Sequence, residues 1–360
     1  MIGLGGWPNE LEDQVVIKKT FLIFSCLFVF LCLNGPVYAD RCLFSIKPVQ
    51  LSEESQKAII LHNLKEEVLI LATELRADGE TEVLEFIPLP SEPTVTLADG
   101  DPFGEAVKLI AKKKLEFEER GVSRGSAETV PVEIRFAEKI GVHDVTVIKI
   151  NDLSGFSRWT EEFFVKKGVK VSIDRLSNFY KNAEDYLRRG FHYFVFDYVK
   201  VSKEIKLIEP LVYRFRSERL YYPLRTSNVI GGKGTIDLIL ILPGTIQMTG
   251  EDYQTIWRPT VQDIKKTTMD FSSSAKVYPH EIQKIYPGAD DFFKSNRVTY
   301  MQVLRYSGDY QFREDLFYDL SNLVPFAYKI VNRFQRFEDL LTADELRDYL
   351  DYLKRKGVIK

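Results

Sequence analysis

The sequence of 360 residues predicts an α+β fold, with a mainly antiparallel sheet, packed helices and a C-terminal helical tail. Hydrophobic residues make up 45% of the chain, which is enough for a large core and too many for a disordered protein. Short runs of alternating apolar and polar residues predict strands in neighbouring pairs. Two helical patterns follow one another between the strands, and this order favours α+β over a repeated βαβ series.

Composition and charge exclude several classes of protein. Fifteen prolines and 21 glycines without a regular period exclude collagen-like and low-complexity chains. Three cysteines are too few for a disulfide scaffold or a cysteine-rich zinc module. The formal net charge of −3 comes from 49 basic and 52 acidic residues, which argues against a nucleic-acid partner.

Residues 1–39 predict an export signal. Two lysines precede an apolar run over residues 21–33, and small side chains then lead to a cleavage site between Ala39 and Asp40. As a helix the run rises about 20 Å, which is short of the roughly 30 Å hydrocarbon core of a bilayer. We therefore expect export to the periplasm or the cell exterior with cleavage. An uncleaved segment that anchors the protein in the membrane is the alternative.

The segment before these lysines is unlike the basic start of an export signal. Residues 1–15 are acidic and rich in glycine. We interpret them as a spurious upstream extension and expect the natural start at Val15 or Val16, read from an alternative start codon.

Cys42 is the lone thiol of the predicted mature chain, because Cys26 and Cys32 lie in the apolar run. The mature chain then has no internal disulfide, and in an oxidising compartment this thiol is buried, free or paired between molecules. Lipidation is disfavoured because Arg41, and not a small residue, precedes Cys42. A thiol nucleophile is also disfavoured, because a chain terminus rarely holds a side chain rigidly.

Residues 40–245 are predicted to form the α+β core domain. Alternating and apolar runs predict its strands at residues 57–63, 67–75, 82–87, 130–137, 144–150, 191–201, 213–215 and 235–242. Pro88, Pro90 and Pro93 are expected to prevent regular pairing after the third of these strands.

Three helices are expected within this domain. The first begins at the N-cap Asp101, buries Val107, Ile110, Ala111 and Leu115, and ends at Gly121. The second and third carry aromatic and leucine residues at helical spacing and end at basic residues followed by glycine; they span residues 153–168 and 176–190.

The rest of the chain is predicted to form an irregular insertion followed by a final core segment with the helical tail. Residues 246–297 are polar and contain several prolines, which predicts irregular structure. Residues 298–360 end in a helix that begins at Thr342, where Glu345 completes a capping box. Its predicted buried stripe consists of Leu346, Tyr349, Leu350 and Leu353.

No motif in the sequence assigns a cofactor, a metal or a catalytic residue. The four histidines, which show no metal-binding spacing, are His62, His143, His192 and His280. The glycine-rich segment 231–235 lacks the spacing of a phosphate-binding loop and precedes a strand, so it is interpreted as a turn. Arginines alternate with aromatic residues over 213–216, which is typical of a strand with its aromatics in the core.

Several segments, in this order and spacing, resemble a family of exported bacterial proteins catalogued as domain of unknown function number twenty-three thirty. The segments are Ser55–Val95 with the turn Pro88–Ser91, Gly141–Val145, the helix with Trp159, Arg189–Val195, Tyr222–Arg225 and Tyr306–Leu316. The resemblance covers about residues 42 to 320. It implies a secreted or envelope protein and no known reaction. The family pattern leads us to expect aromatic residues at positions 143 and 192, where this chain has histidine, and an N-terminal cysteine that Cys42 fits.

These observations favour an exported, non-catalytic binding or structural module with an envelope protein or a glycan as its partner. The first alternative is a hydrolase that acts on an envelope polymer through carboxylates such as Asp144, Asp197 or Asp237. Two carboxylates that face one cleft would favour this alternative. The second alternative is an assembly component anchored in the membrane by the uncleaved N-terminal segment.

Overall fold

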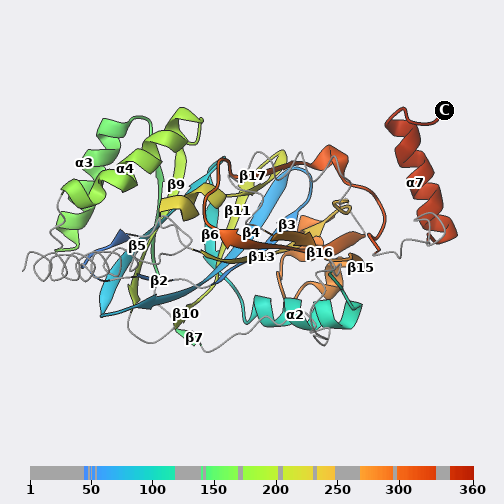
Figure 1. Ribbon diagram of the computed structural model, residues 1–360, viewed down its shortest axis with the longest axis horizontal. Helices are drawn as coiled ribbons and strands as arrows, with labels where there is room; N and C mark the ends of the chain where they lie inside the picture. The colour runs from blue at the N-terminus through green and yellow to red at the C-terminus, as the bar shows by residue number, and fades with distance from the viewer. Residues whose placement is uncertain are drawn as a thin grey trace, which may run out of the picture. The chain divides into compact units, whose positions relative to one another are not determined.

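The computed structural model confirms the α+β fold and mostly antiparallel sheets (Figure 1). It describes residues 44–47, 49, 51–52, 55–117, 139–140, 143–168, 173–201, 206–229, 233–247, 268–294, 298–329 and 341–360. The predicted strand over 130–137 lies outside these residues. Ala39, Asp40, Cys42 and the whole export signal lie outside them as well.

The central sheet is built on four long neighbouring strands. In spatial order they are β16 (Thr299–Asp309), β13 (Lys233–Leu242), β3 (Ser55–His62) and β4 (Glu66–Ala77). The β13–β3 pair is parallel, whereas β16–β13 and β3–β4 are antiparallel. Apolar runs in the sequence predict three of these strands, and β16 was not predicted.

Shorter strands extend this sheet on both sides. Beyond β16 lie β14 (Thr268–Phe271) and β15 (Ala275–Val277). Beyond β4 lie β10 (Lys206–Ile208) and β11 (Leu211–Arg216), which pair with β7 (Lys139–Ile140) and β6 (Thr94–Leu97) respectively. A further short strand, β2 (Leu51–Ser52), also pairs with β4.

A second sheet is antiparallel throughout. Its order is β1 (Phe44–Ser45), β5 (Thr81–Leu89), β9 (Tyr193–Val201) and β8 (Asp144–Lys149). A separate two-stranded sheet pairs β12 (Arg219–Tyr222) with β17 (Leu316–Asp319).

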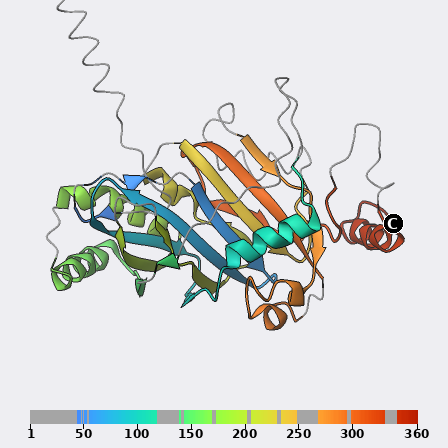
Figure 2. The ribbon, with the colours of Figure 1, turned by 90° about the horizontal axis from the view of Figure 1, so that it is seen from below.

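Helices pack on both sheets. The central sheet has α2 (Pro102–Lys113) on one face, where Phe103 and Ile110 join its apolar residues in a core (Figure 2). The second sheet packs against α3 (Leu153–Lys166) and α4 (Ile173–Arg188) through aromatic rings. Phe86 stacks on Phe194 with ring centroids 5.1 Å apart, and Phe179 of α4 lies 5.3 Å from Phe86. Many of the aromatic residues therefore belong to the core.

The remaining helical segments are short, except for the C-terminal helix. They are η1 (Leu224–Val229), η3 (Pro279–Glu281), α6 (Ala289–Phe292), η4 (Leu320–Asn322) and α7 (Ala343–Arg355). No helix among the described residues is long and apolar enough to cross a bilayer.

Helix α2 begins as predicted but ends early. The Asp101 carboxylate accepts a hydrogen bond from the Gly104 N–H at 2.8 Å, as an N-cap does. The helix stops at Lys113, because Lys114 adopts a left-handed conformation with φ of 54°. The predicted end at Gly121 is therefore wrong, and so is the predicted burial of Ala111, which is exposed.

A glycine at this left-handed position is expected to stabilise the protein. The Lys114→Gly variant should gain about 1 kcal/mol in free energy of unfolding, since glycine adopts positive φ without a steric penalty. Chemical denaturation of the two proteins measures the gain. The matched variant Lys112→Gly lies inside the helix and should instead lose about 1 kcal/mol.

Pro88 lies inside a strand, contrary to the prediction. Strand β5 runs through Pro88, which is directly opposite Phe194 of β9. The Pro88 carbonyl accepts a hydrogen bond from the Tyr221 hydroxyl at 2.9 Å. Because the N and O atoms of one strand residue point to the same side, the missing N–H of Pro88 faces Tyr221 and no bond to β9 is lost.

The segment 246–297 is more regular than predicted. Its described residues 268–271 and 275–277 form strands that pair with β16. Residues after them contribute Ile282, Ile285 and Phe292 to the core under α2. The sequence did not predict these two strands, because short strands at the side of a long sheet carry too few residues to show a period.

The C-terminal helix has the predicted start but not the predicted buried stripe. In the capping box the Thr342 side chain accepts from the Glu345 N–H, and the Glu345 carboxylate accepts from the Thr342 N–H at 2.9 Å. Leu346 and Leu350 are exposed, at 38% and 41%. Tyr349 is half-buried against Phe326 with ring centroids 5.1 Å apart. The period of the leucines therefore predicted the helix correctly and its environment wrongly.

Candidate functional site

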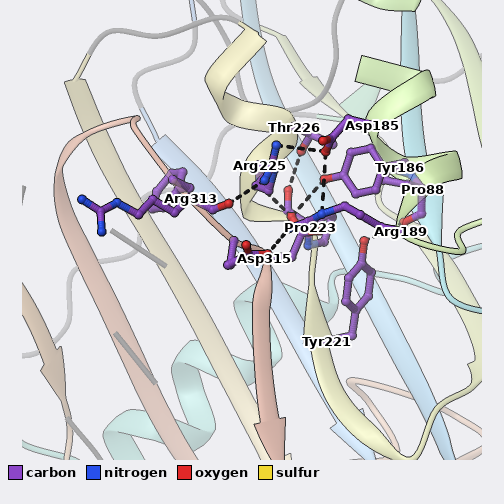
Figure 3. A network of polar contacts seen from close by, with 12 residues as sticks. Pro88, Asp185, Tyr186, Arg189, Tyr221, Pro223, Arg225, Thr226, Arg313 and Asp315 are labelled. Carbon is purple, nitrogen blue, oxygen red and sulfur yellow. Dashed lines mark hydrogen bonds and ion pairs between the residues drawn. The ribbon is translucent and has the colours of Figure 1, made fainter. Parts of the chain in front are cut away.

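Three segments that carry the family resemblance meet in one polar cluster (Figure 3). Arg189 follows the end of α4, Arg225 lies in η1, and Asp315 directly precedes β17. The chain can turn sharply after α4 because Gly190 adopts a φ of 86°, which glycine tolerates. We name this group the Asp315 cluster; its members are Asp185, Tyr186, Arg189, Arg225, Glu314 and Asp315.

The Asp315 carboxylate is fully buried at the centre of the cluster. Its Oδ1 atom accepts hydrogen bonds from the Tyr186 hydroxyl at 2.9 Å and from the Arg225 N–H at 2.8 Å. Its Oδ2 atom accepts from Nη1 of Arg189 at 3.3 Å. Burial raises the pKa of Asp315 to about 6, and these donors together with the arginine charges only partly offset the cost of desolvation.

The outer part of the cluster pairs the two arginines with further carboxylates. Nη2 of Arg225 forms an ion pair with Oδ2 of Asp185 at 2.9 Å, and Nη1 of Arg225 donates a hydrogen bond to the Arg313 carbonyl at 2.6 Å. Arg189 forms ion pairs with Glu314 and, at 3.7 Å, with Asp185. Both guanidinium groups are therefore engaged by acids of the same chain. The cluster joins α4, η1 and the segment before β17, and the geometry is that of a structural clamp.

A second buried polar group adjoins the clamp through Tyr221. The Tyr221 N–H donates to Oε2 of Glu67 at 2.8 Å, while its hydroxyl binds the Pro88 carbonyl. Burial raises the pKa of Glu67 well above its ordinary value, and the bond from Tyr221 opposes this only in part. Tyr221 thereby connects the turn Pro88–Ser91, another segment of the resemblance, to the central sheet.

His143 and Asp197 form a buried pair that the sequence did not predict. The Nδ1 atom of His143 lies 2.5 Å from Oδ2 of Asp197, and its Nε2 atom lies 2.7 Å from the Glu209 carbonyl. Since the Asp197 carboxylate and the Glu209 carbonyl are both hydrogen-bond acceptors, this geometry suits a His143 ring that carries a proton on each nitrogen. Burial lowers the pKa of His143, but the hydrogen bond and charge of Asp197 outweigh this, so the pKa is raised overall.

The His143–Asp197 pair is expected to stabilise the protein most at low pH. A histidine whose pKa is raised by folding contributes stability that is complete below the unfolded pKa of 6.5 and is lost as the pH rises through the folded value. The His143→Gln variant should lower the free energy of unfolding by about 2 kcal/mol at pH 6, since it removes a charge-assisted hydrogen bond. The loss should be smaller at pH 9. Denaturation of both proteins across this range measures the difference. A cost independent of pH would contradict the charged pair.

The three carboxylates suggested for a hydrolase do not converge. Asp144 forms an ion pair with Lys167, and Asp237 binds Arg305 through two bonds of 2.7 and 3.2 Å. In the β8–β9 register Asp144 is opposite Tyr198, and Val145 is opposite Asp197. Since neighbouring residues of a strand point to opposite faces, Asp144 and Asp197 lie on opposite faces of the second sheet.

The other histidines also lie apart from one another. His192 contacts the Ile150 carbonyl through Nδ1 at 3.0 Å, and His280 stacks on Tyr278 at the surface. His62 is buried at the end of β3. Within the described ranges, no group of three or more metal-ligating side chains comes together. The members of the Asp315 cluster were missed as a site, although the resemblance had marked the segments that contain Arg189, Arg225, Glu314 and Asp315.

Comparison with solved structures finds only distant similarities. The crystal structure of baculovirus P35 aligns with 8% identity and a TM-score of 0.39, over 75% of this chain and 96% of that one. A chain from the crystal structure of the caspase-8/P35 complex aligns with 9% identity and a TM-score of 0.34, over 74% of this chain and 96% of that one.

Comparison of the sequence itself is more informative. No curated protein matches the chain. The family described as "Uncharacterized protein conserved in bacteria (DUF2330)" matches residues 39–313, which include every member of the Asp315 cluster except Glu314 and Asp315. The match spans most of the sequence and confirms the resemblance: the chain belongs to the bacterial family DUF2330.

Proposed function

We propose that this chain is an exported bacterial protein that binds a partner at the cell envelope and performs no covalent chemistry of its own. The observation that supports the proposal is the separation of its acidic side chains. The three carboxylates suggested for catalysis are each engaged by a different base: Asp144 by Lys167, Asp197 by His143 and Asp237 by Arg305.

Hydrolysis of a polymer by carboxylates needs a different arrangement. A general acid and its partner carboxylate must face one another across a cleft, about 5–10 Å apart, with room for the substrate. Asp197 is 1% exposed and already binds His143, while Asp144 lies on the other face of the same sheet. The buried Asp315 is held by three donors of the same chain. Buried carboxylates that are bound by groups of the same chain are typical of a rigid scaffold.

The export part of the proposal rests on the N-terminal sequence. Residues 18 and 19 are lysines, the apolar run 21–33 follows, and the cleavage site is expected between Ala39 and Asp40. An envelope protein or a glycan is the partner that such a location supplies.

Fractionation of the native host, followed by intact mass measurement, tests the location. We expect a protein outside the cytoplasm that begins at Asp40, and cross-linking in whole cells should join it to an envelope component. A membrane-bound protein that keeps residues 21–33 would support the anchored assembly component instead. A protein that remains in the cytoplasm would overturn the proposal.

An assay of the purified protein tests the absence of chemistry. Residues 40–360 should release no soluble fragments from cell-wall polymers. Fragment release that is lost in Asp197→Asn, and kept in the surface variant Asp291→Asn, would establish the hydrolase in place of the binding module.

A further inference from the structure

The strand β6 leaves one side of its backbone open. Its residues pair with β11 on one side, and the chain is held there at both ends: the Ser91 hydroxyl donates to the Arg216 carbonyl and the Ala98 N–H to the Pro210 carbonyl. On the other side no strand of the described part of the chain pairs with it. Thr94 and Thr96 are exposed, and Leu97 is exposed at 58%.

This edge lacks the features that usually protect an exposed strand. Charged side chains or prolines within an edge strand discourage pairing with other chains. Two other described edge strands follow this rule, since β8 contains Asp144 and Lys149 and β14 contains Asp270. The sequence of β6 is Thr-Val-Thr-Leu, without a charge or a proline. Its outer backbone groups can therefore accept an additional strand.

The register of β6 defines the side chains that an added strand would meet. Val95 is opposite Tyr213, and Leu97 is opposite Leu211; both partners belong to the large core. Val95 packs on this core, so Leu97 extends the same apolar row toward solvent. Thr94 and Thr96 lie on the other face. An added strand with alternating apolar and polar residues would match both faces.

Acidic residues flank the open edge. Glu92 and Asp99 are exposed, and neither forms an ion pair with another described residue. A second copy of this chain that paired through β6 about a two-fold axis would bring Glu92 of one copy close to Asp99 of the other. Like charges at these positions would repel, whereas lysine or arginine there would attract.

We propose that the open edge of β6 binds an extended segment of a partner protein, in which alternating apolar and polar residues are flanked by basic ones. The added strand supplies main-chain hydrogen bonds, Leu97 contacts its apolar side chains, and the two acids select its ends. This inference rests on the proposed function as a binding module and specifies the partner as a protein strand.

A pair of synthetic peptides tests the inference on the mature chain, residues 40–360. The probe is a fluorescein-labelled Lys-Ser-Val-Thr-Val-Thr-Ser-Lys, and the control has glutamate in place of both lysines. By fluorescence anisotropy the basic peptide should bind about five- to tenfold more tightly than the acidic one, since two exposed ion pairs differ between them. The double variant Glu92→Lys with Asp99→Lys should reverse this preference.

Two further measurements assign the binding to the strand edge. A version of the basic peptide with methylated backbone nitrogens at alternate residues should not bind, because it cannot donate to the sheet edge. The Leu97→Lys variant should bind at least tenfold more weakly, since it places a charge on the edge strand. The matched variant Val165→Lys, at a residue exposed at 76% on α3, should bind normally. Both variants should keep the thermal midpoint of the parent protein.

Three results would overturn the inference. They are equal binding of the basic and acidic peptides, binding that survives backbone methylation, and a concentration-dependent dimer of the parent protein that Leu97→Lys dissociates. A partner that is cross-linked in cells to both the parent and the Leu97→Lys protein would leave the binding function intact and refute this site alone.

Discussion

Replacing Asp315 with alanine is expected to lower the free energy of unfolding at pH 7 by about 3 kcal/mol. The Tyr186 hydroxyl and the Arg225 N–H both donate to this carboxylate in a buried environment, and each would lose its acceptor. Arg189 would lose its most buried ion-pair partner. Because the three donors come from two separate segments, the loss should also loosen α4 from η1. Urea denaturation followed by circular dichroism measures the effect.

Two variants separate the role of the carboxylate from that of its neighbours. Asp315→Asn keeps an oxygen for the two donors to Oδ1, so we expect a loss of about 1 kcal/mol at pH 7. Glu314→Ala removes an ion pair whose carboxylate is 47% exposed, and it should change the stability by less than about 1 kcal/mol. If Asp315→Ala were no less stable than Glu314→Ala, the cluster would not act as a clamp.

The raised pKa of Asp315 predicts a specific dependence on pH. Folding raises this pKa from 3.8 to about 6, so the folded protein binds a proton more tightly than the unfolded chain. The resulting stabilisation is complete below pH 3.8 and is lost as the pH rises through 6. The free energy of unfolding of the parent protein, relative to that of Asp315→Asn, should therefore increase by roughly 3 kcal/mol as the pH falls from 7 to 4. A constant difference between them would show that the carboxyl does not titrate in the folded state.

The strands that sequence predicts best are those with long apolar runs. Strands β3, β9 and β13 each carry consecutive buried branched or aromatic residues, and their positions agree with the prediction within two residues. The equally long β16 was missed because polar residues interrupt it. Its Gln302 is buried, accepts from the Ile246 N–H at 3.1 Å and donates to the Ser272 carbonyl at 3.1 Å. A glutamine satisfied in this way is indistinguishable in the sequence from a loop residue.

The site was less predictable than the fold, for a related reason. Arg189 and Asp315 are separated by 126 positions, and Arg225 and Asp315 by 90. No local period connects them, so their contact depends on how the second sheet, η1 and β17 pack together. The resemblance identified the segments, but a resemblance between sequences does not show which side chains face each other. The same limit applies to His143, which directly precedes β8, and Asp197 of β9, since the two come together only in the folded chain.

His62 is expected to weaken the folded state in acid. Burial lowers its pKa from 6.5 to about 4, and the nearby backbone of Arg219 and Ser217 opposes this only in part. Its Nδ1 atom accepts a hydrogen bond from the Leu64 N–H at 2.9 Å, which requires an unprotonated nitrogen. Between pH 6.5 and 4, His62 binds a proton in the unfolded chain but not in the folded protein. The contribution of His62 to the free energy of unfolding therefore falls by about 3 kcal/mol as the pH falls through this range.

The His62→Asn variant tests this expectation. The asparagine oxygen can accept the hydrogen bond from Leu64 and does not titrate, so the variant should show about 3 kcal/mol less acid destabilisation between pH 6.5 and 4 than the parent. The surface variant His280→Asn should keep the pH dependence of the parent. A His62→Asn protein that is as sensitive to acid as the parent would show that His62 is protonated in the folded state.

The contributions of His62 and Asp315 oppose each other over nearly the same range of pH. Acid weakens the folded state through His62 and strengthens it through Asp315, because one buried site excludes a proton and the other retains one. In the parent protein the two effects, each about 2 kcal/mol between pH 4 and 6, largely cancel each other. The single variants should then change the pH dependence of the free energy of unfolding in opposite directions. Relative to the parent, Asp315→Asn should be less stable in acid, and His62→Asn should be more stable in acid. The double variant should show nearly the pH dependence of the parent, since the two sites share no hydrogen bond and their opposite effects should add.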